Sequence, residues 1–349
     1  MSSTDDVLIS SITIYLGLPI LICGTLGNLF NIRLLWRIRH NPCVFIFLVT
    51  SFINCIVLFY GLLTRVLNVG FHFDWSTKNR IWCKTRATFS PASFLISFTC
   101  TCLASVDRFL VSCRQEKYRK LSRLSIATWE IIVTIIFWLA IYIPYLVYTE
   151  IVRSPFTGIL YCALVGDAVF SNYQMYFAFP VYYGLLPSTV LTITGLLTYK
   201  NTNKLQINRQ RQLVQKQITS MMLIQIPIIL FSTLPYVIFT EYSTFTATMT
   251  KSDNQRTVEL VMTNIVSITC YITFACPFFV FFSTSKTFRE DAKMLFLCRK
   301  ATLLRTNQVQ PHFRNNMRYI QSISMRTNQI PCNFTTMVKN IKSTIVNEE

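Results

Sequence analysis

Residues 87–106 read ATFSPASFLISFTCTCLASV, a stretch without Asp, Glu, Lys or Arg. It is followed at once by Asp107 and Arg108. About 20 apolar residues of α-helix cross the hydrocarbon core of a bilayer. The stretch therefore predicts a helix that crosses a membrane and ends at a charged pair.

Six further charge-free runs of membrane-spanning length occur along the chain. The next longest run, 154–166, is too short to cross a bilayer. Strands of a membrane barrel would give short alternating segments, and these runs do not alternate. The expected fold class is therefore an all-α seven-transmembrane helix bundle. The six runs are 7–32, 42–64, 131–149, 168–199, 217–240 and 260–285.

The composition agrees with a membrane protein and excludes other classes. Of 349 residues, 52% are apolar and 14% charged, against about 25% charged in soluble domains. Disorder is excluded because its signature is low hydrophobicity, and 12 cysteines are too dilute for a small disulfide scaffold. The three histidines are too scattered for a metal cluster. We expect neither an enzyme nor a bound cofactor.

The distribution of Lys and Arg predicts the orientation. Segments alternate between two sides, and the side that holds the N-terminus carries only eight of the 33 basic residues: Arg65, Lys78, Arg80, Lys84, Arg86, Arg153, Lys251 and Arg256. The positive-inside rule then places the N-terminus outside and the C-terminus in the cytoplasm of a multi-pass plasma-membrane protein. The net charge of +18 lies mostly on the cytoplasmic rim, where it attracts anionic lipid rather than nucleic acid.

The chain divides into four parts. We expect an extracellular N-terminus over 1–10, a seven-span domain over 11–284, an amphipathic membrane-surface helix over 285–298, and a disordered cytoplasmic tail over 299–349. The surface helix is predicted by one helical stripe of apolar residues, Phe288, Ala292, Leu295 and Phe296. Cys298 lies beside basic residues at its end and is a candidate for palmitoylation; an ordinary reduced cysteine is the alternative.

This topology leaves only Cys83 and Cys162 on the oxidising side. Two lone cysteines in an oxidising compartment usually pair, so we expect a disulfide between them. Cys83 is 25 residues from Arg108, or about 37 Å of helix at about 1.5 Å per residue. One residue therefore lies at the outer edge of the third span when the other lies at the inner edge.

With these features, the chain from Ile9 to Cys298 resembles a rhodopsin-like (class A) G-protein-coupled receptor, of a divergent invertebrate neuropeptide or chemosensory type. The segment 24–28, Gly-Thr-Leu-Gly-Asn, is similar to the family's first-span motif. Asp107-Arg108-Phe109 resembles the Asp-Arg-Tyr motif. Pro235 and Pro277 resemble the prolines of the sixth and seventh spans.

The resemblance implies a mechanism. An extracellular ligand enters between the helices, the inner end of the sixth span swings outward near Pro235, and a heterotrimeric G protein inserts a helix against Arg108. Asp107 and Phe109 then belong to the coupling site. The helix-switch positions are Asn28, Asn54, Pro235 and Pro277.

Several positions depart from the family pattern. Asn54 stands where the family usually has Asp, which weakens an allosteric sodium site because a neutral amide binds a hard cation poorly. Thr233 replaces the sixth-span Trp, and Cys276 and Val280 replace the seventh-span Asn and Tyr. These changes concern the switches and leave the scaffold intact.

The resemblance favours a peptide ligand. Ser90 takes the third-span position that carries a carboxylate in aminergic relatives, and no Lys lies in any run to form a retinal Schiff base. Acidic residues on the outer rim would meet a basic peptide. The pocket candidates are Ser90, Phe94, Tyr236 and Thr240; ordinary packing between helices is the alternative for each.

Two other functions stay open. A small-solute transporter would need charged or broken helices at mid-membrane, and a seven-span protein that has lost coupling would act as a scaffold or decoy. Dependence on Arg108 distinguishes a coupled receptor from both.

Overall fold

The computed structural model describes residues 3–153, 160–165, 168–204, 209–246, 249–285, 288–290 and 292–293. Within these residues, seven helical segments are long and apolar enough to cross a membrane. They confirm the seven predicted runs, and all seven extend beyond at least one end of their run. The segments are Asp5–Ile38, Pro42–Gly70, Arg80–Ser112, Leu124–Tyr148, Gln174–Thr202, Thr219–Phe245 and Asp253–Ala275.

The elements follow one another in a simple up-and-down order. The α-helices are α1 (Ser3–Leu35), α2 (Pro42–Val57), α3 (Arg80–Ser112), α4 (Glu116–Arg119), α5 (Leu124–Tyr148), α6 (Ala168–Tyr173), α7 (Leu186–Lys204), α8 (Arg209–Phe245), α9 (Asp253–Thr269), α10 (Ile272–Ala275) and α11 (Pro277–Thr284). A 3₁₀ turn, Trp36–Ile38, follows α1. Wider π-helical turns are Leu58–Leu63, Val66–Gly70, Gln174–Ala178 and Pro180–Leu185. The strands are β1 (Thr149–Arg153) and β2 (Leu160–Leu164).

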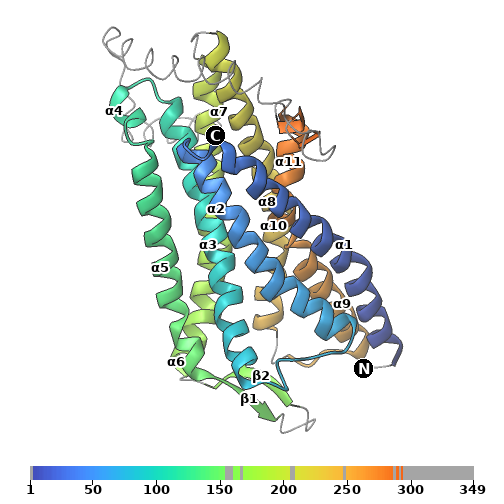
Figure 1. Cartoon of the computed structure of the whole chain (residues 1–349). Coiled ribbons are helices and arrows are strands. Elements are labelled where there is room, and N and C mark those ends of the chain that lie inside the picture. Colours follow the sequence, from blue (N-terminus) through green and yellow to red (C-terminus); the bar gives the residue numbers. More distant parts are fainter. Residues whose placement is uncertain are drawn as a thin grey trace, which may run out of the picture.

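Helix α3 lies at the centre of the bundle (Figure 1). It packs against α2, α5 and α7, while α1 packs against α2 and against α9 to α11. Helix α8 contacts α7 on one side and α9 to α11 on the other, which closes the ring. The N-terminus lies at the same end as the strands. We call this the disulfide end and the opposite one the Arg108 end.

Several helices extend past the charge-free runs. Helix α1 begins at Ser3, within the segment expected to precede the bundle. The second segment continues through two π-helical turns to Gly70, and α3 begins at Arg80. Charged residues that the sequence placed in loops, among them Arg65 and Arg86, therefore lie on membrane-spanning segments. Long cationic side chains can follow a helix surface while their heads seek polar groups.

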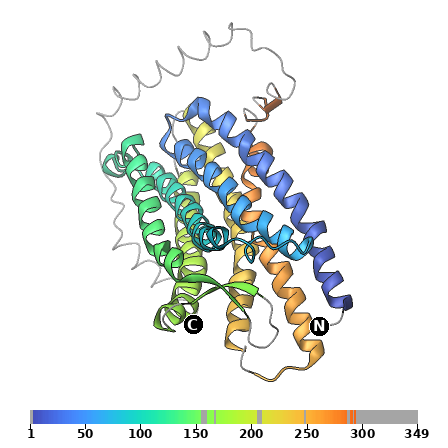
Figure 2. The ribbon, with the colours of Figure 1, turned by 60° about the horizontal axis from the view of Figure 1, so that its bottom comes forward.

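A β-hairpin covers part of the disulfide end (Figure 2). Strands β1 and β2 pair antiparallel, with Ile151 opposite Cys162. The disulfide between Cys83 and Cys162, separated by 79 residues, ties this hairpin to the start of α3. The predicted disulfide is confirmed, while the hairpin was not predicted.

The last membrane segment is interrupted. Helix α9 ends at Thr269, α10 covers one turn, and Pro277 begins α11. Proline suits the first position of a helix because its missing N–H has no partner there in any case. The chain thus restarts a helix at Pro277, whereas Pro235 lies inside the continuous helix α8.

Gly24 permits the close approach of α1 to this interrupted segment. A Cβ atom at Gly24 would lie 2.6 Å from the Cβ and 3.0 Å from the Cα of Ala275. Backbone atoms cannot move aside as a flexible side chain can. We expect Gly24→Ala to lower the melting temperature of the purified chain, and Cys23→Ala, on the exposed face, to leave it unchanged. Equal melting temperatures for both variants would contradict this packing.

The disulfide generates a second prediction. Either Cys83→Ser or Cys162→Ser breaks the same covalent link, so the two variants should lose equal thermal stability. The double variant should lose no more than either single one, because coupled residues are non-additive. The exposed free Cys23 provides the control through Cys23→Ser. Additive losses in the double variant would show that the two cysteines act independently.

Candidate functional site

The charged pair near the end of α3 is buried. Arg108 is 3% exposed and Asp107 7% exposed. The Arg108 guanidinium donates to Asp107 Oδ2, with Nε at 3.1 Å. The Ser122 hydroxyl donates to the other oxygen, Oδ1, from the loop after α4. A buried charge is costly unless it is paired, and here the carboxylate neutralises the guanidinium.

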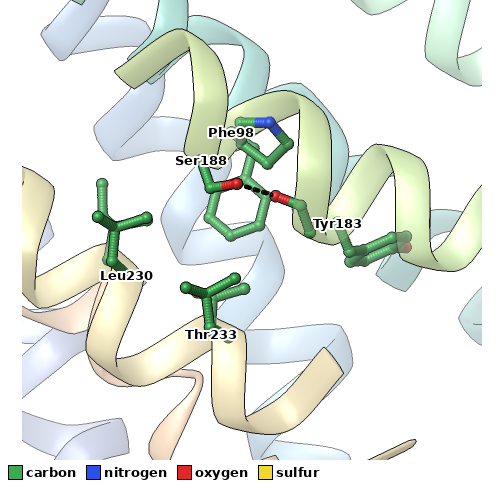
Figure 3. Close-up of a pocket in the computed structure, with 9 residues that line it drawn as sticks. Phe98, Tyr183, Ser188, Leu230 and Thr233 are labelled. Atoms are coloured by element: carbon green, nitrogen blue, oxygen red, sulfur yellow. Dashed lines mark hydrogen bonds between the residues drawn. The ribbon is translucent and has the colours of Figure 1, made fainter. Parts of the chain in front are cut away.

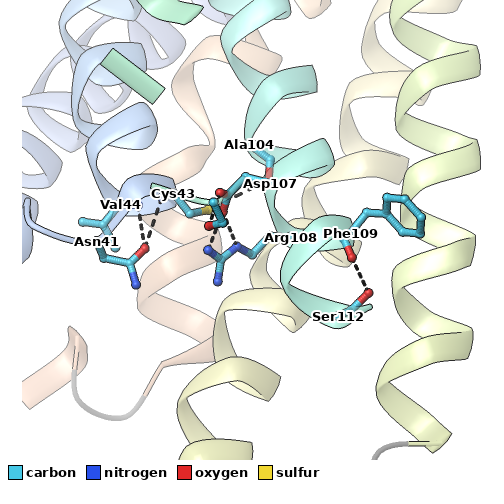
Figure 4. A network of polar contacts seen from close by, with 9 residues as sticks. Asn41, Cys43, Val44, Ala104, Asp107, Arg108, Phe109 and Ser112 are labelled. Atoms are coloured by element: carbon cyan, nitrogen blue, oxygen red, sulfur yellow. Dashed lines mark hydrogen bonds and ion pairs between the residues drawn. The ribbon is translucent and has the colours of Figure 1, made fainter. Parts of the chain in front are cut away.

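Neighbouring groups fix the surroundings of this pair (Figure 4). Asn41 accepts hydrogen bonds from the backbone N–H groups of Cys43 and Val44 and so caps α2 beside the pair. Ser112 donates to the Phe109 carbonyl at 2.7 Å, and Asn201 of α7 donates to Ser112. Cys43 of α2 also donates its thiol to the Ala104 carbonyl at 4.0 Å, so the end of α3 is held from both α2 and α7. Release of Arg108 from Asp107 would free the N–H groups at Nε and Nη2 to donate to other acceptors.

A polar network lies deeper in the bundle. The Asn28 amide donates to the Gly24 carbonyl at 2.8 Å and to the Phe274 carbonyl at 2.9 Å. Asn54 donates to Asn28, and Ser97 donates to Asn54. The structure thus brings together Asn28 and Asn54, two predicted switch positions, and joins α1, α2 and α3 to the interrupted last segment.

The interruption is also bonded to α8. Thr273 shares hydrogen bonds with the hydroxyls of Ser232 and Thr233, at 2.5 and 3.3 Å. In a continuous helix, the Thr273 carbonyl would accept the backbone N–H of residue 277, which proline lacks. The Cys276 thiol donates to this carbonyl instead, at 3.6 Å. Thr233 and Cys276, two of the departures from the family pattern, therefore have defined structural partners.

Two of the four pocket candidates join one aromatic cluster. Phe94 packs against Tyr183 with ring centres 5.0 Å apart, and Tyr183 packs against Phe179, which contacts Tyr236. Among the described residues, no hydrogen bond or ring contact connects Ser90 or Thr240 to this cluster. The structure therefore brings Phe94 and Tyr236 together and leaves Ser90 and Thr240 as separate predictions.

The space beside the aromatic cluster is nearly filled (Figure 3). A cavity of about 10 Å³ lies between Phe98, Tyr183, Ser188 and Thr233. A cavity of this size is at the lower limit for a single water molecule. This cavity is therefore too small for a ligand larger than a water molecule.

The predicted surface helix is described only in part. Phe288–Glu290 and Ala292–Lys293 are helical, and the Ser285 hydroxyl accepts the Phe288 N–H at 3.2 Å, as a helix cap does. Phe288 and Ala292 are buried, and the Phe288 ring packs against Phe278 and Phe281 of α11. The rest of the stripe, Cys298 and the tail lie outside the described residues.

Sequence reasoning missed two residues of the disulfide end, Arg65 and Arg86. Both were counted as loop charges, because a run defined by the absence of charge ends at the first charged residue. Their position on the helices could have been found by continuing the second and third spans past the first charged residue at the end of each run. Both donate hydrogen bonds only to neutral groups in the described part of the chain.

No protein-family model matches the sequence, and no curated protein matches it. The fold and the polar clusters thus define a class, a bundle of seven helices able to span a membrane and carrying a disulfide. Any narrower assignment is a proposal from the residues themselves.

The central network generates a prediction. Asn28→Ala removes both donors at once and leaves the Phe274 carbonyl without a side-chain donor in the core. An unsatisfied buried polar group costs about 1–3 kcal/mol, so the variant should melt well below the wild type.

Ser97→Ala is the matched control, since it removes one donor at the edge of the network and leaves the Asn28–Asn54 contact in place. It should lower the melting temperature less. An Asn28→Ala variant as stable as Ser97→Ala would rule out this network as the main restraint on the interrupted segment.

Proposed function

We propose that the chain is a G-protein-coupled receptor that binds an extracellular ligand and activates a heterotrimeric G protein through the Arg108 end. The observation that carries the proposal is α3 itself. One continuous central helix holds the disulfide at its first turn and a buried, neutralised Arg108 at its last turns. The disulfide fixes the end of the bundle where we expect the ligand to bind. At the other end, a helix movement would expose the buried Arg108 to a partner protein.

The charges support the proposed orientation, with the disulfide end outside. Of the eight basic residues assigned to that side, only Lys78, Arg153 and Lys251 lie outside the spanning segments. The Arg108 end borders the basic links after α1 and α3. By the positive-inside rule, that end faces the cytoplasm of the plasma membrane, where anionic lipid would attract it.

The switch in this proposal is the Asp107–Arg108 pair. Ser122 and Arg108 both donate to Asp107, so the carboxylate holds the loop after α4 as well as the guanidinium. A movement of the inner end of α8, pivoting near Pro235, would open the bundle beside α3. Arg108 would then exchange Asp107 for backbone carbonyls of the G protein.

The test is G-protein nucleotide exchange in membranes that contain the full chain, with a panel of peptides and small metabolites. We expect ligand-dependent exchange from the wild type and at least about a tenfold loss in Arg108→Ala, since one charge-assisted contact is worth about 1.5–3 kcal/mol. Arg256→Ala, an exposed position on α9 at the other end, should retain exchange.

Surface labelling of an N-terminal tag should accompany this assay. A chain that reaches the surface and binds a ligand without exchange would support the uncoupled scaffold and contradict the receptor proposal. Ligand accumulation inside sealed vesicles would support the transporter.

A further inference from the structure

Two arginines lie within the disulfide half of the bundle. Arg65, on the second membrane segment, donates from Nη2 to Asn264 Oδ1 of α9 at 3.1 Å. Arg86, on α3, donates from Nε to Thr64 Oγ1 and from Nη1 to Ser76 Oγ, both at 3.1 Å. Every one of these acceptors is neutral, so neither guanidinium is compensated by the contacts that position it.

Two carboxylates of this end are paired with other cations. Glu150 on β1 pairs with Arg80 and with Lys84, and hydrogen bonds from these two side chains lower the pKa of Glu150 to about 2. The Glu150 carboxylate therefore stays ionised at neutral pH and paired with these two cations. Glu259 pairs with Lys251. No ion pair in the described part of the chain includes Arg65 or Arg86.

Asp74 lies within electrostatic range of the Arg86 guanidinium. It forms no ion pair with Arg86, and its Oδ1 accepts the Ser76 backbone N–H at 2.8 Å. One carboxylate cannot neutralise two guanidinium groups. The site keeps a net positive charge.

The two guanidinium groups lie within electrostatic range of each other and of Tyr271, at the interruption of the last segment. Tyr236 on α8, a pocket candidate from the sequence, is within range of Arg65 as well. The positive charge thus lies near residues of two other segments. The Nε atom of Arg65 is buried and has no hydrogen-bond partner among the described residues.

An uncompensated cation within a membrane bundle is expensive, and such residues mark ligand or ion sites. An incoming anion would supply both the missing charge and the acceptor for Arg65 Nε. Two guanidinium groups match carboxylate or phosphate oxygens because their N–H donors form a planar fork.

We propose that Arg65 and Arg86 form an anion-binding subsite, with Asn264, Thr64 and Tyr271 around it, and that the ligand carries a carboxylate, phosphate or sulfate group. The role of this subsite in signalling rests on the proposed receptor function. Binding of an anion to the subsite does not. The sequence alone favours a basic peptide that meets acidic residues on the outer rim, whereas this subsite requires an anionic group on the ligand. A peptide with an acidic residue or a free C-terminal carboxylate satisfies it.

The test is thermal unfolding of the full chain in phosphatidylcholine nanodiscs, with sodium phosphate or sulfate replacing sodium chloride at constant ionic strength. We expect a saturable rise in melting temperature, since a ligand that binds only the folded state stabilises it. The general salting effect of these anions is not saturable. Arg65→Gln and Arg86→Gln should each weaken the apparent affinity about tenfold or more, and Arg256→Gln should not change it.

The variants provide an internal check on folding. Without phosphate or sulfate, Arg65→Gln should melt at or above the wild-type temperature, because the substitution removes an uncompensated charge. A purely structural arginine would give a lower temperature instead. A saturable curve that is the same in the wild type and in the Arg65→Gln/Arg86→Gln double variant, or no saturable component with any probe, would overturn the proposal.

A second arm separates two sources of the anion. Nanodiscs that contain phosphatidic acid test a lipid headgroup. A shift that depends on Arg65 and appears with phosphatidic acid, but not with soluble phosphate, assigns the site to lipid. The measurement contains no G protein. Loss of nucleotide exchange would therefore count against the receptor alone, and loss of the saturable shift against the anion site alone.

Discussion

The arrangement of this bundle depends on how the interrupted last segment is bonded inside an apolar core. A broken helix exposes carbonyl groups that water cannot reach, and each unsatisfied group costs several kcal/mol in hydrocarbon. Asn28 supplies the donor for Phe274, and Thr273 is bonded to α8. Because Asn28 is itself bonded to Asn54, and Asn54 to Ser97, four segments are fixed around one break. A movement of α8 must therefore change hydrogen bonds at the interruption.

The cations at the two ends of the bundle have opposite surroundings. At one end Asp107 neutralises Arg108, and the Ser122 hydroxyl donates a hydrogen bond to the other carboxylate oxygen. At the other end, hydroxyl and amide groups position Arg65 and Arg86 without cancelling their charge. The first arrangement keeps Arg108 buried and its charge neutralised. The second leaves a positive charge that a charged ligand would neutralise. Helix α3 carries Arg86 and Arg108 on one rigid element.

The neutral network between the ends has a physical consequence. Asn54 donates to Asn28 and accepts from Ser97, so its amide is used as both donor and acceptor. A carboxylate at this position could not donate to Asn28. The network is therefore matched to a neutral amide at position 54.

The sequence by itself determined the seven helices, their order and the disulfide. In a bilayer every backbone group must be hydrogen-bonded within the protein, and long apolar runs that do not alternate achieve this as helices. Because successive links lie on alternate sides of the membrane, only Cys83 and Cys162 were expected on the oxidising side. It also selected Asn28, Asn54 and Arg108, although not their partners. Tertiary structure alone decided that Pro277 restarts a helix, that Ser122 reaches Asp107 and that Arg65 and Arg86 lie on the helices. Those outcomes depend on contacts between residues far apart in the chain, and a local pattern of charge and hydrophobicity does not contain them.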